Sequence, residues 1–353
     1  MPDASTLPPL TPDGAFPAAD RPAMYFIGVT THQSSIMKVF PRWAECLGLK
    51  DAVIRGMNFR QHDEPANYRK ALAFIRQDPL SLGALVTTHK IDLLKACRDQ
   101  FDRLDPLAEL TGEVSSISKD GSQLVGHAKD PITSGLALDA FLPQGHWART
   151  GAEALVLGAG GSAIAITWHM LQKKLGSNRP ARIIITNRSV PRLEEMRRFH
   201  ERIGADLPLE YHHTPSPEYA DAIVGRLPPH SLVINATGLG KDAPGSPLTD
   251  RADWPRNGFA WDFNYRGELL FLAQARAQQA EKGLHIEDGW IYFIHGWTRV
   301  IAEVFHIEIP TCGPRFDELL RVAASVERTR KERHANEPQD IADQTVRAPV
   351  RPG

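Results

Sequence analysis

The sequence predicts an α/β protein built from two domains. Its 353 residues exceed the size at which a single hydrophobic core stops growing, so two cores are expected. Short apolar runs alternate with segments of helical periodicity, first over residues 24–101 and again over residues 153–265. This alternation is typical of βαβ units around a parallel sheet. A glycine-rich turn at residues 158–161 stands between an apolar run and a helical segment at the start of the second series.

In the first half, three strands and three helices are expected in alternation. The expected strands are short and apolar: residues 24–29, 51–59 and 82–88. The expected helices carry apolar side chains at helical spacing: residues 34–49, 66–77 and 90–101. Residues 112–128 differ, because two extended pieces flank Asp120-Gly121, which is a hairpin signal. Residues 131–142 are expected to form a helix that leads out of the first domain.

The second half opens with a strand, the glycine turn and a helix over residues 153–174. Further strands are expected at residues 181–188, 231–237 and 259–265, with a helix at 192–204. Two helices close the pattern, an aromatic-rich one at 289–305 and an amphipathic one at 315–333.

These patterns divide the chain into five parts. The polar or Pro-rich ends are expected to be a disordered leader and a disordered tail. The middle is expected to contain two α/β domains and a last helical segment that packs back on the first domain. In order, the parts are residues 1–22 (leader), 23–135 (first domain), 136–287 (second domain), 288–330 (helices) and 331–353 (tail).

Charge and composition exclude several classes of protein. Lys and Arg total 41 against 42 Asp and Glu, so no net field attracts nucleic acid or an anionic membrane, and neither partner is expected. Three widely spaced cysteines without a C-x-x-C pair, and histidines without a helical i, i+4 pair, predict no metal site. No apolar run reaches the roughly 18 residues of a transmembrane helix. The N-terminus lacks the features of a signal peptide, so the expected compartment is the cytoplasm.

The glycine turn is suited to a phosphate. Free backbone N–H groups and the dipole at the start of a helix attract an anion, and a side chain in the turn would block its approach. With a strand before it and a helix after it, the turn predicts a Rossmann-type dinucleotide site, although Ala163 stands where the third glycine usually lies.

The end of the next strand indicates which dinucleotide binds. An NAD site usually has Asp or Glu there to accept a hydrogen bond from the ribose 2′-hydroxyl. This chain has Asn187-Arg188-Ser189 and then Arg192, which can bind a 2′-phosphate through charge-assisted hydrogen bonds. The expected cofactor is NADP(H).

Residues 24–328 also resemble the shikimate dehydrogenase family. GAGG, ITNRSVPR, LVINATGLG and WDFNY are similar to that family's glycine loop and its N-R-T-x-x-R, I-N-A-T-S and D-x-x-Y motifs. The resemblance implies that the second domain binds NADP(H) and the first domain binds the substrate. It implies a cofactor site made of Gly158, Ala159, Gly160, Gly161, Ser162, Asn187, Arg188, Ser189, Arg192, Ala236, Thr237 and Gly238.

In the first domain the resemblance includes the catalytic residues. VTTHK resembles V-T-V-P-F-K with one residue fewer and points to Lys90, and GHAKDPITSG resembles G-x-N-T-D-x-x-G and points to Asp130. Hydride transfer at a carbinol carbon needs a proton donor and a cation for the developing alkoxide. Lys90 can supply both, and Asp130 can orient it. His89 either shares this acid role or packs where the family has phenylalanine.

The substrate side departs from the family pattern. The predicted substrate-binding residues are Ser34, Thr87, Ser115, Tyr265 and His295. Four hydrogen-bonding positions of the family (Ser, Asn, Asn and Gln) are replaced by Ile36, Ala128, Ser115 and the His295-Gly296 pair. A site that loses such partners loses affinity for the original substrate, so a substrate other than shikimate is expected.

The resulting prediction is an NADP(H)-dependent dehydrogenase or reductase of a small cyclic hydroxylated molecule, acting as a monomer or homodimer. A reductase of a different carbonyl or imine is the nearest competitor among enzymes. The alternative from another class is an NADP(H)-binding sensor or regulatory module with reduced turnover.

Overall fold

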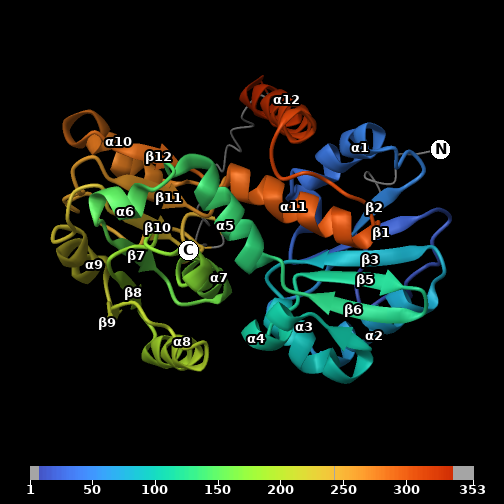
Figure 1. The fold of residues 1–353 in the computed structure, drawn as a ribbon. Coiled ribbons are helices and arrows are strands. Elements are labelled where there is room, and N and C mark those ends of the chain that lie inside the picture. The colour runs from blue at the N-terminus through green and yellow to red at the C-terminus, as the bar shows by residue number, and fades with distance from the viewer. Residues whose placement is uncertain (1–7, 242, 337–353) are drawn as a thin grey trace, which may run out of the picture.

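Each half of the chain is organised by one six-stranded sheet (Figure 1). The computed structural model describes residues 8–241 and 243–336. Within them the first sheet is mixed and the second is wholly parallel. The α/β class with two domains is therefore confirmed.

The first sheet has the spatial order β2-β1-β3-β5-β6-β4. Its strands are β1 (Ala23–Gly28), β2 (Val53–Asn58), β3 (Ser81–Val86), β4 (Arg103–Leu104), β5 (Ser116–Asp120) and β6 (Gln123–His127). β1 pairs in parallel with β2 and β3, whereas β5 runs antiparallel to β3 and β6. Gly121, with φ +60°, makes the hairpin turn between β5 and β6. Because β1 and β3 are parallel, the loops after them start from the same edge of the sheet.

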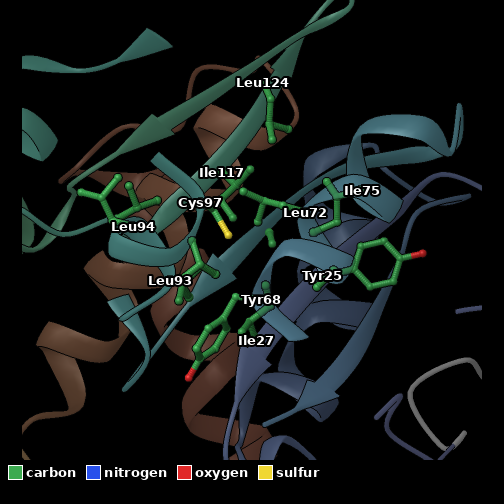
Figure 2. Close-up of a cluster of buried hydrophobic side chains, with 14 of the residues drawn as sticks. Tyr25, Ile27, Tyr68, Leu72, Ile75, Leu93, Leu94, Cys97, Ile117 and Leu124 are labelled. Atoms are coloured by element: carbon green, nitrogen blue, oxygen red, sulfur yellow. The ribbon is translucent and has the colours of Figure 1, made fainter. Parts of the chain in front are cut away.

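Both faces of the first sheet are covered, as the alternation of side chains along β1 requires. Tyr25 and Ile27 face α2 (Pro65–Gln77) and α3 (Lys90–Cys97), in the cluster that Figure 2 shows. Met24 and Phe26 face the other way. There they pack with α1 (Ile36–Leu47), α11 (Trp290–Val304) and α12 (Pro314–Asn336). The last two helices thus complete a core whose strands lie at the other end of the sequence.

The second sheet has the order β12-β11-β10-β7-β8-β9. Its strands are β7 (Ala154–Leu157), β8 (Ile183–Asn187), β9 (Leu209–His213), β10 (Leu232–Asn235), β11 (Phe259–Asp262) and β12 (His285–Glu287). The strand order reverses between β7 and β10, and in such sheets ligands bind beyond the carboxyl ends of the strands at that point.

Helices cover both faces of the second sheet. One face packs against α5 (Asp130–Phe141), α6 (His146–Thr150), α7 (Gly161–Met170) and α8 (Val190–Arg202). The other packs against α9 (Pro217–Val224) and α10 (Leu270–Lys282). Helix α5 also packs against α11, so it lies between the two halves of the molecule (Figure 1).

Several elements, most of them short, are absent from the sequence expectations. They are β4, β9, β12, α4 (Pro106–Thr111), α6, α9 and α10. Residues 8–22 of the expected disordered leader lie against the first domain, where Leu10 pairs with Met57 and the Phe16 ring lies 5.3 Å from that of Phe74. Residues 331–336 of the expected tail continue α12. Residues 1–7 and 337–353 of the two expected disordered segments lie outside the described residues. In the described chain, no helix is both long and apolar enough to span a membrane.

Candidate active site

The glycine turn connects β7 to α7 and leaves no room for a side chain at its first residue. Gly158 has φ +119°, and a Cβ there would lie 2.7 Å from the Ala236 carbonyl oxygen at the end of β10. Its N–H donates to the Thr186 carbonyl oxygen of β8 at 2.8 Å. The turn is thereby held between the ends of the two neighbouring strands, with the start of α7 facing outward from the sheet edge.

A cavity of about 490 Å³ opens at this edge, within the size range of small-molecule sites. Nine of the predicted cofactor residues line it: Gly158, Ala159, Gly160, Gly161, Asn187, Arg188, Arg192, Ala236 and Thr237. Ser162, Ser189 and Gly238 are not among the lining residues but adjoin them in the chain. The loop from β9 to α9, including Thr214 and Ser216, also lines the cavity, and the sequence analysis did not include it.

Two arginines lie where β8 meets α8. The Asn187 Oδ1 atom accepts the Ser189 N–H at 3.1 Å and shapes the turn. Arg188 is exposed, and Arg192 forms a half-exposed ion pair with Glu195 at 3.1 Å. A surface pair of this kind contributes little energy, so Arg192 can exchange it for a phosphate. These residues fit the 2′-phosphate of NADP(H), and the glycine turn fits its pyrophosphate.

A second cavity of about 300 Å³ lies where the two domains meet. The predicted substrate residues Ser34, Thr87 and Tyr265 line it. So do Lys241 and Arg266 of the second domain, which the sequence analysis did not single out. The Arg266 guanidinium donates to the Gln33 carbonyl oxygen at 2.9 Å and so ties the second domain to the loop after β1.

A smaller adjoining cavity of about 120 Å³ contains the proposed catalytic pair. Lys90 begins α3, Asp130 begins α5, and their side chains form a largely buried ion pair. Ser115 also lines this space, and its hydroxyl accepts the Lys129 N–H at 2.7 Å, which fixes the backbone just before Asp130.

The surroundings of the pair keep Lys90 protonated. Burial favours the neutral amine, but the carboxylates of Asp130 and Glu113 outweigh it, so the pKa of Lys90 is raised. Tyr292 of α11 faces Asp130. Burial and the two carboxylates raise the pKa of this tyrosine well above its ordinary value, so its hydroxyl stays a hydrogen-bond donor.

Glu113 is a charged neighbour of the pair that the sequence analysis did not single out. Its side chain is 3% exposed, and burial and the nearby Asp130 raise its pKa to about 7, against the opposing effect of Lys90. The signal was present in GEVSS, where Glu stands at the alanine of the G-A-V-N-T motif.

His89 faces away from the cavities. Its Nδ1 atom is 3.0 Å from the Tyr68 hydroxyl, and its ring packs beside Phe59 in the core of the first domain. Burial lowers its pKa. Of the two roles left open for His89, packing in place of phenylalanine is the one that its position supports. The shortened loop places Thr88 at φ +55°, a strained conformation for a β-branched residue.

His295 does not lie where the substrate prediction placed it. It is 2% exposed, and its ring stacks on Phe316 of α12 at 4.6 Å, on the side of α11 away from the cavities. The neighbouring Gly296 lines the small cavity instead, and a Cβ there would meet nothing within 4 Å. One residue along a helix is a rotation of about 100°, which accounts for the difference.

The remaining substitutions are apolar and buried. Ile36 and Ala128 are both 0% exposed and belong to the cores of the first domain. The described residues contain no cluster of three or more His, Cys, Asp or Glu side chains able to hold a metal ion. The individual roles assigned to the site residues stay predictions.

Comparisons with known proteins agree with this geometry. No protein-family model matches the chain. The shikimate dehydrogenase (NADP(+)) of Symbiobacterium thermophilum is 31% identical over 234 residues, covering 65% of this chain and 72% of that protein. The enzyme of the same name from Streptococcus thermophilus is 29% identical over 183 residues, covering 51% of this chain and 59% of that protein.

Two solved structures share the fold. Shikimate dehydrogenase from Thermus thermophilus, in complex with NADP(H) and shikimate, superposes with a TM-score of 0.63 at 21% identity, covering 86% of this chain and 99% of the other. Quinate dehydrogenase from Corynebacterium glutamicum, in complex with NAD, gives a TM-score of 0.64 at 17% identity, with 86% and 99% covered.

The position of His295 predicts a role in stability and none in turnover. Burial and the nearby Arg299 lower its pKa to about 4, below its ordinary value of about 6.5. The unfolded chain therefore binds more protons between these two values, and the free energy of unfolding falls as pH decreases through that window, by up to about 1.4 kcal/mol per pH unit.

His295→Phe removes this contribution of His295 to the pH dependence of stability. Urea unfolding at pH 7 and pH 4.5 should show a smaller loss of stability in the variant. Its kcat/KM at pH 7 should stay within about twofold of wild type; a tenfold loss would mean that His295 contacts the substrate.

Proposed function

Because the chain belongs to the shikimate dehydrogenase family and is thus an NAD(P)-dependent dehydrogenase, we propose that it transfers a hydride between NADP(H) and a hydroxyl or carbonyl carbon of a small cyclic substrate other than shikimate. The observation that carries the proposal is the buried Lys90–Asp130 pair in a cavity that adjoins the predicted substrate residues.

The bound cofactor supplies or accepts the hydride. In the direction of reduction, the protonated Nζ atom of Lys90 donates a proton to the substrate oxygen as the C–H bond forms, and in oxidation the neutral amine takes that proton back. Asp130 holds the ammonium and stabilises its charge. The Tyr292 hydroxyl and the aromatic rings of α11 close the cavity on the opposite side and reduce access of water.

The preference for NADP(H) rests on the end of β8, where Asn187 is followed by Arg188 and no carboxylate is present. The relatives include enzymes named for NADP(+) and a structure solved with NAD. The choice between the two cofactors therefore rests on the residues of this chain. A guanidinium beside a phosphate dianion contributes charge-assisted hydrogen bonds that the ribose hydroxyl of NADH cannot make with equal strength.

The choice of substrate rests on the apolar side chains that replace hydrogen-bonding groups. The small cavity gains room at Gly296 and is lined by Tyr292, Phe293 and Trp297. A less polar ring substituent than a hydroxyl fits the part of this space beside Phe293 and Gly296, because neither residue offers a buried hydroxyl a side-chain hydrogen-bond partner.

Arg188→Ala should weaken NADPH binding by about 30-fold, the scale of one strong charge-assisted hydrogen bond, and leave NADH nearly unchanged. Arg198→Ala, an exposed arginine on α8 outside the cavity, is the matched control and should alter neither affinity. Calorimetric titration with both nucleotides measures the effect. Equal wild-type affinities for NADPH and NADH would contradict the cofactor assignment.

Lys90→Ala should lower kcat by about 10² or more while NADPH affinity stays within a few-fold, since general acid–base groups typically contribute 10²–10⁴. Lys95→Ala, an exposed lysine in the last turn of the same helix, is the control. The measurement is steady-state turnover on a substrate found by screening cyclic hydroxylated compounds and their carbonyl forms with NADP⁺ and NADPH. Normal turnover by the Lys90 variant would exclude it as the acid. Tight NADPH binding with no substrate found in the screen would favour a sensor.

Shikimate itself should be a poor substrate. Each missing hydrogen-bond partner costs about 1–3 kcal/mol, so two losses at the low end already reduce kcat/KM by roughly 30-fold. A steady-state assay with shikimate and NADP⁺ at alkaline pH tests this directly. Turnover at about 10⁴ M⁻¹s⁻¹ or above would show that the substitutions are compensated and that the substrate assignment is wrong.

A further inference from the structure

Glu113 lies where the two halves of the site meet. Helix α4 ends at Thr111, Gly112 follows with φ +69°, and Glu113 lies three residues before the start of β5. The next residue, Val114, donates its N–H to the Lys90 carbonyl oxygen at 3.2 Å. The segment that carries Glu113 is thus attached to the first residue of α3, whose side chain is the proposed acid.

The carboxyl group reaches from the first domain to the glycine turn of the second. A Cβ on Gly161, the first residue of α7, would lie 2.7 Å from the Glu113 Oε2 atom. The Oε1 atom is buried and has no hydrogen-bond partner among the described residues. Buried carboxyl oxygens are normally hydrogen-bonded. The unpartnered Oε1 atom belongs to a carboxyl group whose other oxygen lies against the start of α7, and this arrangement points to a ligand at that position.

The charged and titratable groups around Glu113 come from three elements. They are Lys90 on α3, Asp130 on α5 and Tyr292 on α11. Tyr292 is neutral, so the carboxyl groups of Glu113 and Asp130 share one ammonium in a largely buried space. Full ionisation would leave one uncompensated negative charge, and a proton on one carboxyl group relieves it.

We propose that Glu113 is a positioning residue that holds the Lys90 ammonium together with Asp130, and that the proton state of Glu113 is coupled to the phosphate group bound at Gly161. The inference rests on the proposed function, because it takes the glycine turn to bind the pyrophosphate of NADP(H). No covalent step is involved, and Glu113 acts through Lys90 and through its own charge.

A bound pyrophosphate brings negative charge close to the Glu113 carboxylate. Ionised Glu113 repels it, whereas protonated Glu113 can donate a hydrogen bond toward it or toward Asp130. Binding therefore raises the pKa of Glu113 above the value of about 7 that it has in the free protein. The complex then holds more protons than the free protein above that pH, so NADPH affinity falls as pH rises, by up to about tenfold per pH unit.

The test compares NADPH affinity at pH 6 and pH 8.5 in wild type, Glu113→Gln and Glu109→Gln. Gln keeps the shape of Glu and removes the titration. Glu109 lies on α4 and forms a half-exposed ion pair with Arg98, so its variant is the matched control. Calorimetry in two buffers of different ionisation enthalpy also counts the protons taken up. Wild type and the control should lose about tenfold more affinity than Glu113→Gln between the two pH values, and only they should take up the additional proton at the higher pH.

A second readout separates positioning from structure. Glu113→Gln should shift the pH profile of kcat on the identified substrate, because Lys90 loses one carboxylate neighbour and its pKa falls, and Glu113→Asp should restore part of the profile. If Glu113→Gln does not fold, Glu113→Ala serves in both measurements. An identical pH dependence of NADPH affinity and of kcat in wild type and variant would overturn the role of Glu113 alone. Failure of wild type to bind NADPH at either pH would overturn the proposed function and this inference with it.

Discussion

The structure depends on pairing one largely buried ammonium group, that of Lys90. A buried cation must be paired, and the Lys90 side chain is paired with Asp130 from another helix. Lys90 and Asp130 are the first residues of α3 and α5, so the ion pair connects the starts of both helices. Because α5 also packs along α7 of the second domain, the same pair links the first domain to the second. The position of the proposed acid and the contact between the two domains therefore depend on the same ion pair.

Much of the fold and of the cofactor site could be predicted because both depend on local spacing. Strand runs, helical periodicity and the turn at Gly158 are readable within a window of a few residues. Most residues predicted to hold the nucleotide do line one cavity, since the ends of β7, β8 and β10 meet at the point where the strand order reverses. The direction in which a side chain points from a strand end is fixed by the strand itself.

The substrate side was less predictable because its residues are brought together by packing between distant segments. His295 and Gly296 differ by one position, and only the contact of α11 with α12 decides which of them faces the cavity. The role proposed for Glu113 depends on its neighbours Lys90 and Gly161, which lie in two different domains. Residues 8–22 belong to a segment whose composition predicts disorder, yet they lie against β2 and α2 through contacts that no local pattern signals.

The return of the last two helices to the first sheet determines the order in which the chain can fold during synthesis. The face formed by Met24, Phe26 and Phe40 is covered only once Trp297 and Phe316 have been made. The whole second domain is translated in between, and at about 5–20 residues per second that delay is on the order of ten seconds or more. During this delay, the part of the sheet face that α11 and α12 later cover is exposed to other nascent chains on the same messenger RNA. Its yield in a cell is accordingly governed by chaperone supply and translation speed as well as by the stability of the finished protein.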